Sequence, residues 1–117
     1  MARTVLIVDD HARFRRSARA LLEFEGFEVV GEAATGEEAM AMAAALAPHT
    51  LLLDIQLPDV DGFEVAARLL EASPSPEIVF VSDRDPADYG ARVAASGARG
   101  FIAKGTLSPE TLRGCLQ

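Results

Sequence analysis

Short apolar runs alternate with amphipathic stretches along the chain. Val5 to Val8 and Leu51 to Leu53 are continuously apolar, as expected of strands buried on both faces. The stretches between such runs carry apolar residues at helical spacing. The pattern predicts strands at residues 4–8, 28–32, 50–54, 77–81 and 99–103, and helices near 12–25, 36–46, 62–72, 86–95 and 109–116. This alternation is typical of βαβ units and a parallel sheet.

The predicted strands differ in how apolar they are, and the difference indicates their order. The first, third and fourth are apolar throughout, whereas the second and fifth, around Glu28 and Arg99, are mixed. Mixed composition suits the edges of a sheet. With right-handed crossovers, edges at strands two and five fit the order 2-1-3-4-5. We therefore expect an α/β fold with a doubly wound, five-stranded parallel sheet and five helices.

Local signals agree with the predicted helix ends. Thr35 with Glu38, and Asp61 with Glu64, have the spacing of a capping box, and Gly26 is expected to end the first helix. Two further starts place a capping residue before a first-turn proline; these are Asp85-Pro86 and Ser108-Pro109. The apolar stripe of the first helix is expected to comprise Phe14, Ala18, Leu21 and Leu22.

Polar side chains follow four of the predicted strands at one edge of the sheet. Asp9 and Asp10 follow the first strand, Asp54 ends the third, Ser82 follows the fourth and Lys104 follows the fifth. The order 2-1-3-4-5 puts its switch point between strands one and three, where ligands bind. Three crowded carboxylates repel one another, and a hard cation relieves this repulsion. With neither His nor Cys in the set, Mg²⁺ is the expected cofactor.

These residue types suit phosphoryl transfer. Asp54 can act as the nucleophile and form an aspartyl phosphate. Mg²⁺ held by Asp9 and Asp10, together with Lys104, would neutralise the phosphoryl oxygens, and the Ser82 hydroxyl would donate a hydrogen bond to one of them. Each residue alone has a structural explanation, as a helix cap, a turn residue, a strand end or a solvated lysine. Their coincidence at four strand ends favours the functional interpretation.

Composition narrows the class of protein. The chain has 117 residues, 50% hydrophobic and 25% charged, which fits one globular domain. Its net charge of −7 argues against binding to nucleic acid. The single Cys115 excludes an internal disulfide and suits a reducing compartment. The longest apolar run near the start is too short for a signal peptide, so we expect a cytoplasmic protein without membrane association.

Over essentially its whole length the sequence resembles the response-regulator receiver domain of two-component signalling. Four motifs carry the resemblance: Val8-Asp9-Asp10; Asp54 with Pro58 and Gly62; Val81-Ser82; and Gly100-Phe101-Ile102-Ala103-Lys104. His11 after the acids, and the approach to the lysine from Gly97, are similar to the NarL/FixJ-type subfamily. The resemblance implies a flavodoxin-like receiver fold.

The resemblance also implies roles for the residues at the edge of the sheet. Asp54 would accept a phosphoryl group from the phosphohistidine of a sensor histidine kinase or a histidine phosphotransfer domain. Asp10, Asp54 and the backbone carbonyl of Gln56 would bind Mg²⁺, and Asp9 would act mainly through a bound water. Such a domain catalyses its own phosphorylation and slow dephosphorylation but is not a turnover enzyme.

A switch is implied as well. Ser82 would move towards the phosphoryl group and Phe101 would turn inward, reshaping the face formed by the fourth helix, fifth strand and fifth helix. Tyr89, beside Gly90 in the weak fourth helix, lies in this moving region. Pairing of two copies on phosphorylation is a further hypothesis.

Receivers of this kind usually precede a DNA-binding domain, whereas we expect residues 1–117 to form one receiver domain with no DNA-binding domain in this chain.

Some positions depart from the family pattern and leave alternatives open. Asp83 follows Ser82 where a small residue is usual, and Gly105 follows Lys104 where a proline is common. Asp83 would either slow phosphorylation or point to solvent. One alternative function is an interaction module that keeps the receiver fold but works without phosphate. Another is a Mg²⁺-dependent aspartyl-phosphate hydrolase, which would need an acid at position 56, where this chain has Gln56.

Overall fold

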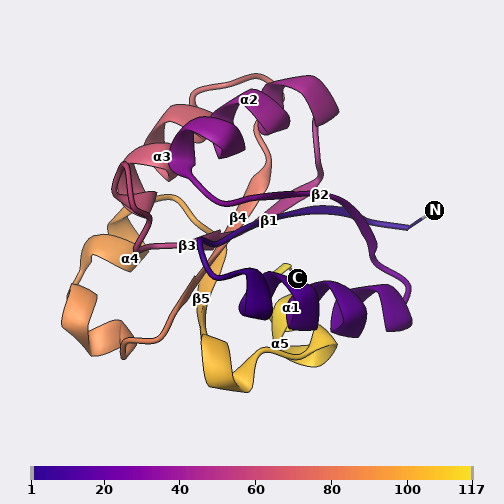
Figure 1. The fold of residues 1–117 in the computed structure, drawn as a ribbon. Coiled ribbons are helices and arrows are strands. Elements are labelled where there is room, and N and C mark those ends of the chain that lie inside the picture. Colours follow the sequence, from indigo (N-terminus) through magenta and orange to yellow (C-terminus); the bar gives the residue numbers. More distant parts are fainter. Residues whose placement is uncertain (1, 117) are drawn as a thin grey trace.

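The fold is a parallel sheet covered by helices on both faces (Figure 1). The computed structural model describes residues 2–116. Within this range the sheet has five strands in the order β2-β1-β3-β4-β5, all parallel, which confirms the predicted topology. The strands are β1 (Thr4–Val8), β2 (Glu28–Ala33), β3 (Thr50–Asp54), β4 (Glu77–Ser82) and β5 (Gly100–Ala103).

The helices form two layers around the sheet. The α-helices are α1 (Ala12–Phe24), α2 (Gly36–Leu46), α3 (Gly62–Leu70), α4 (Arg92–Ala95) and α5 (Pro109–Leu116), and two short 3₁₀ turns are η1 (Pro86–Tyr89) and η2 (Lys104–Thr106). Figure 1 shows α1 and α5 on one face and α2, α3 and α4 on the other. Among residues 2–116, none of the helices has both the length and the apolar character needed to cross a membrane.

The alternation of side chains along the strands divides the core in two. In β1, Leu6 and Val8 pack with α2 and α3, whereas Val5 and Ile7 pack with α1 and α5. All four side chains are buried because β1 is a central strand with helices on both sides. The continuous apolar run in the sequence is therefore the consequence of a strand that has no solvent-facing side.

The predicted helix over residues 86–95 is wrong in its continuity. Residues 86–89 form the 3₁₀ turn η1, and α4 begins only at Arg92. Gly90 separates them with φ at 57°, a left-handed backbone that an α-helix cannot contain. No residue of η1 or α4 is fully buried. This segment therefore has little support from the core, mainly through the partly buried Tyr89 and Val93.

Two local expectations are confirmed, and a third is only partly met. Gly26 ends the first helix region with a positive φ of 92°, and the Thr35 hydroxyl accepts a hydrogen bond from the Glu38 N–H. Asp61 is the N-cap of α3, as expected, but the full capping box does not form, because its side chain accepts from the Phe63 N–H instead of the N–H of residue 64. The side chain of Glu64 pairs with Arg68 one turn later.

The first helix also differs from its predicted stripe. Ala18 and Leu22 are buried, and Phe14 is partly buried, but Leu21 is 37% exposed. Leu21 precedes Leu22 by one residue, about 100° around a helix, so both cannot face the sheet fully.

Candidate functional site

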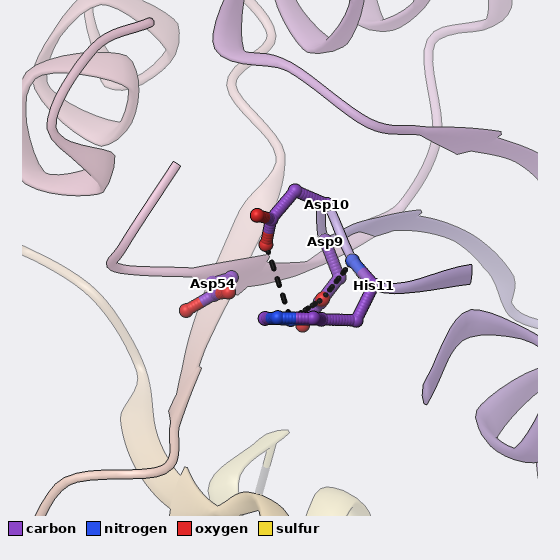
Figure 2. Close-up of side chains that lie close together, drawn as sticks. All are labelled: Asp9, Asp10, His11 and Asp54. Atoms are coloured by element: carbon purple, nitrogen blue, oxygen red, sulfur yellow. Dashed lines mark hydrogen bonds and ion pairs between the residues drawn. The ribbon is translucent and has the colours of Figure 1, made fainter. Parts of the chain in front are cut away.

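The site lies where three strands end. Asp9 and Asp10 directly follow β1, Asp54 is the last residue of β3, and Lys104 directly follows β5. Because β1 and β3 are neighbours whose connections run to opposite faces of the sheet, their carboxyl ends form the switch point of the fold. Figure 2 shows the side chains of Asp9, Asp10 and Asp54 converging there.

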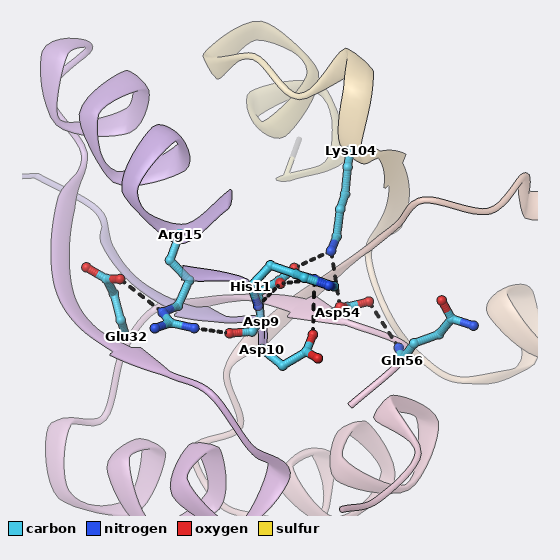
Figure 3. A network of polar contacts seen from close by, with 8 residues as sticks. All are labelled: Asp9, Asp10, His11, Arg15, Glu32, Asp54, Gln56 and Lys104. Carbon is cyan, nitrogen blue, oxygen red and sulfur yellow. Dashed lines mark hydrogen bonds and ion pairs between the residues drawn. The ribbon is translucent and has the colours of Figure 1, made fainter. Parts of the chain in front are cut away.

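Lys104 is the cation of the site. Its Nζ lies 2.6 Å from Oδ2 of Asp9 and 3.2 Å from Oδ2 of Asp54 (Figure 3). Only 8% of the Lys104 side chain is exposed. Burial alone would lower the pKa of Lys104, but its contacts with Asp9 and Asp54 outweigh burial and raise that pKa. The lysine therefore remains charged between the two carboxylates.

Asp54 is a buried carboxyl group, only 2% exposed. Its Oδ1 accepts a hydrogen bond of 3.0 Å from the backbone N–H of Gln56, and its Oδ2 faces Lys104. Burial, with a smaller contribution from the charge of Asp9, raises the pKa of Asp54 to about 6, although Gln56 and Lys104 act in the opposite direction. The carboxylate of Asp54 is thus less stable than an ordinary aspartate and gains from any additional positive charge nearby.

His11 joins the acidic cluster, which the sequence did not indicate. Its backbone N–H donates to Oδ1 of Asp9 at 2.8 Å, and its Nδ1 lies 3.2 Å from Oδ1 of both Asp9 and Asp10. Its position directly before a helix is also that of a local cap or a surface residue. It does occupy the N-cap position of α1 and is largely exposed, but its side chain makes no capping hydrogen bond. Its ring faces the carboxylates instead (Figure 2).

The donor atoms of this cluster suit a divalent cation. Asp9, Asp10, His11 and Asp54 each offer one atom, and these atoms lie within 4.8 Å of one another. Three of the four are carboxylate oxygens, the ligands that hard cations such as Mg²⁺ prefer. Asp9 and Asp54 are buried and Asp10 is at the surface, so the cluster is open on the side of Asp10.

Arg15 links the site to the edge of the sheet. Its Nη1 donates to the backbone carbonyl of Asp9 at 2.5 Å, and its Nε donates to Glu32 of β2 at 3.1 Å (Figure 3). Arg19 pairs with the same glutamate at 2.6 Å. Both arginines of α1 thus pair with an acid of the neighbouring edge strand. The contact from Arg15 to the Asp9 backbone adds support for the loop that carries two of the carboxylates.

Ser82, the last residue of β4, and Phe101 of β5 both contact Tyr89. Ser82 is completely buried, and its Oγ lies 2.7 Å from the hydroxyl of Tyr89. The rings of Tyr89 and Phe101 are 6.0 Å apart between centroids. Among the described residues, no hydrogen bond joins Ser82 to Asp54. Sequence reasoning placed Tyr89 in a mobile helix but gave no sign that it would hold the hydroxyl of Ser82.

Relatives of known sequence support one family. The family model for the response regulator receiver domain matches residues 5–117. A putative transcriptional regulator of Pseudomonas aeruginosa is 41% identical over 100 residues, which are 86% of this chain and 48% of that protein. The virulence factors putative positive transcription regulator BvgA of Bordetella pertussis is 38% identical over 104 residues, 89% of this chain and 50% of its own. The chain thus spans about half the length of these relatives.

Solved structures agree with this assignment. The signal receiver domain of the putative response regulator NarL from Mycobacterium tuberculosis has a TM-score of 0.85 and 32% identity, covering 98% of this chain and 94% of that one. The response regulator domain of Thermotoga maritima CheB has a TM-score of 0.87 and 26% identity, covering 100% and 96%. The fold, the acidic cluster and the match over residues 5–117 together show that the chain belongs to the family of response regulator receiver domains of two-component systems.

Proposed function

We propose that the domain accepts a phosphoryl group on Asp54 in a Mg²⁺-dependent reaction. The observation that carries the proposal is the position of Asp54 between the ammonium of Lys104, at 3.2 Å, and the backbone N–H of Gln56, at 3.0 Å. A carboxylate attacks phosphorus only when ionised, and a pKa of about 6 leaves most of Asp54 ionised at neutral pH. Asp54 is also next to two further carboxylates that can hold a cation.

The reaction is a transfer between two proteins. The donor is the phosphohistidine of a sensor histidine kinase or a histidine phosphotransfer domain, the partners of receiver domains. The P–N bond of the phosphohistidine breaks as a P–O bond to a carboxylate oxygen of Asp54 forms. Lys104 balances the charge of the phosphoryl oxygens from one side. The Ser82 hydroxyl donates a hydrogen bond to one of these oxygens after it has left Tyr89.

Mg²⁺ would be held by Asp9, Asp10 and Asp54, with the backbone carbonyl of Gln56 as a further ligand. The bound cation would neutralise phosphoryl oxygens and screen the repulsion between the carboxylates. Asp10 is the exposed member of the set, and the cation would enter from its side. Asp9 is held by Lys104 at 2.6 Å and would act mainly through a bound water.

The output is a change of protein contacts. Phosphorylation would shift Ser82 and Phe101 and so alter the face formed by α4, β5 and α5, which can then bind a partner or a second copy of the chain. Asp54 would lose its phosphoryl group slowly, so the domain acts as a switch in the cytoplasm and not as a turnover enzyme. Residues 1–117 would act as one receiver domain that makes no contact with nucleic acid, in line with the net charge of −7. Control of transcription, suggested by the names of the relatives, would pass through protein contacts.

The test is the intact mass of the protein after incubation with acetyl phosphate. The wild type should gain one phosphoryl group in the presence of Mg²⁺ and none without it. Asp54→Asn, which keeps the shape of the side chain, should gain none, whereas the exposed Asp88→Asn should behave like the wild type. If the wild type gains no phosphoryl group under any condition, the domain is better described as a phosphate-independent interaction module. If it releases phosphate with rapid turnover, a hydrolase is the better description.

A further inference from the structure

The Ser82 hydroxyl has a fixed set of neighbours in this structure. Its Oγ accepts a hydrogen bond from the Arg84 N–H at 3.0 Å and shares another, of 2.7 Å, with the hydroxyl of Tyr89. Because Ser82 is completely buried, water cannot readily replace either partner. A serine hydroxyl has a single hydrogen to donate. With that hydrogen donated to Tyr89, Ser82 has to leave Tyr89 before it can donate to a group on Asp54.

Tyr89 is held in place by its ring as well as by its hydroxyl. Its ring packs edge-on against Phe63, with 5.8 Å between centroids, and against Phe101 at 6.0 Å. Phe63 in turn packs against the buried Phe80. Tyr89 is only partly buried, so its hydroxyl can turn to solvent when Ser82 leaves it. Loss of this hydrogen bond therefore costs less free energy at the Tyr89 hydroxyl, which can bind water, than at the buried Ser82 hydroxyl.

Tyr89 also anchors a weakly supported segment. It is the last residue of η1, and Gly90 follows it with a positive φ of 57°. Neither η1 nor α4 has a fully buried residue. The hydrogen bond to Ser82 is therefore one of few contacts that tie this segment to the end of β4, and its loss would loosen the surface next to Phe101.

We propose that Tyr89 is a positioning residue that holds the Ser82 hydroxyl away from Asp54 until phosphorylation. The inference rests on the proposed function of Asp54. Breaking the hydrogen bond between Ser82 and Tyr89 adds a free-energy cost to reaching the phosphorylated state. When Ser82 donates to the phosphoryl group, the hydroxyl of Tyr89 loses its partner and turns to solvent. The exchange of one hydrogen bond for another links the chemistry at Asp54 directly to η1 and α4.

The chain provides its own reporter for this exchange. Tyr89 is the single tyrosine, and there is no tryptophan, so intrinsic tyrosine fluorescence reports on this side chain alone. The probe is beryllium trifluoride with Mg²⁺, a stable mimic of the phosphoryl group, and its binding is measured separately by calorimetry. In the wild type, fluorescence should change in proportion to the bound mimic. In Ser82→Ala, where Tyr89 has already lost its partner, the mimic should cause little change.

Removing only the hydroxyl of Tyr89 should favour binding. Tyr89→Phe keeps the ring contacts with Phe63 and Phe101, and should bind the mimic about fivefold more tightly, the ratio given by one hydrogen bond of about 1 kcal/mol. In the Ser82→Ala background the same substitution should change the affinity by less than about twofold. A role in packing alone would give equal effects in both backgrounds.

The two proposals fail in different ways. If the wild type does not bind the mimic, or if Asp54→Asn binds it equally well, the proposed function of Asp54 is wrong. If the wild type binds the mimic through Asp54 but its tyrosine fluorescence stays constant, or if Tyr89→Phe binds with wild-type affinity, the function stands and the positioning role of Tyr89 is wrong.

Discussion

The ammonium group of Lys104 lies closer to Asp9, at 2.6 Å, than to Asp54, at 3.2 Å. Asp9 has no exposed surface, and Lys104 is the single lysine in the chain. The lysine therefore has a structural task, balancing a buried carboxylate of β1, in addition to the one proposed at the phosphoryl group. Its contact with Asp9 leaves Asp54 with the weaker share of the positive charge.

Lys104→Ala should destabilise the fold markedly. The substitution leaves the buried carboxylate of Asp9 without its counter-charge, and breaking such a pair costs about 3–5 kcal/mol. Urea unfolding at pH 7 would measure the change. Arg68→Ala removes an exposed ion pair with Glu64 and should cost less than about 1 kcal/mol. Equal effects of the two substitutions would show that the Lys104 pair contributes no more than a surface pair.

Asp54→Asn should stabilise the domain at pH 7 in the absence of divalent cations. The pKa of Asp54 is raised from 3.8 to about 6 on folding. Stability from this group is therefore present below about pH 4 and is lost as pH rises through about 6. The variant avoids that loss and should be more stable than the wild type at pH 7 by up to about 3 kcal/mol, with the two converging near pH 4. Urea unfolding at both pH values measures the difference.

Asp59→Asn gives a control of opposite sign. Hydrogen bonds from the backbone N–H groups of Gly36 and Glu37 lower the pKa of Asp59. Its contribution to stability is thus present above the unfolded pKa and lost as pH falls through the folded one. The variant should be less stable than the wild type at pH 7 and approach it in acid. If the stability of the Asp54 and Asp59 variants, relative to the wild type, changed with pH in the same direction, the opposite pKa shifts would be contradicted.

Mg²⁺ should stabilise the wild type through the acidic cluster. A ligand that binds only the folded state adds about 2.7 kcal/mol at a hundred times its Kd. Asp10→Asn removes one carboxylate oxygen from the cluster, so the Mg²⁺ concentration needed for the same rise in Tm should increase by at least about tenfold. Thermal unfolding in a Mg²⁺ series provides the measurement. Asp88 is an exposed acid of η1, and Asp88→Asn should show the same rise in Tm with Mg²⁺ as the wild type. If Asp10→Asn and Asp88→Asn lost this Mg²⁺ effect equally, general screening of charge would explain it.

Gly62→Ala should displace the loop after Asp54. A Cβ on Gly62 would lie 2.5 Å from the backbone oxygen of Asp54 and 2.7 Å from Cα of Ile55, and neither backbone atom can yield easily. The variant should lose stability and accept phosphoryl groups more slowly, measured by unfolding and by intact mass. Gly114→Ala in α5 meets no atom within 4 Å and should stabilise the protein by about 0.5–1 kcal/mol. A neutral Gly62→Ala would mean that the loop can move without cost.

Asp83→Ala should leave the rate of phosphorylation by acetyl phosphate within about twofold of the wild type. Asp83 follows Ser82 but is exposed, so solvent screens its charge. Time courses of intact mass would measure the rate. A much faster variant would show that the Asp83 carboxylate repels the incoming phosphoryl donor, the other of the two expectations from its sequence position.

The topology could be predicted from the sequence because it depends on patterns that repeat along the chain. Continuous apolar runs mark strands that are covered on both faces, and mixed runs mark the edges, which gave the order of the sheet correctly. Parallel strands bring their carboxyl ends to one edge, so the meeting of Asp9, Asp10, Asp54 and Lys104 also followed from the chain order. The capping role of Thr35 could be predicted because its partner, Glu38, is only three residues away.

Contacts between residues distant in sequence were decided only by the tertiary structure. Asp59 caps α2 from a loop more than twenty positions away, with hydrogen bonds of 2.8 Å to Gly36 and 3.0 Å to Glu37. Helical spacing did not reveal that Gly90 breaks the predicted helix over 86–95, since a positive φ leaves no mark in an apolar pattern.

The sequence by itself therefore determined the fold and the carboxylates with their lysine, because strand composition and strand-end position are local properties of the chain. Only the tertiary structure decided that the Ser82 hydroxyl is bonded to Tyr89, and that the ring of His11 faces Asp9 and Asp10. The direction of a side chain at the edge of a sheet depends on the neighbours that fill the space around it. Those neighbours come from separate loops that only folding brings together.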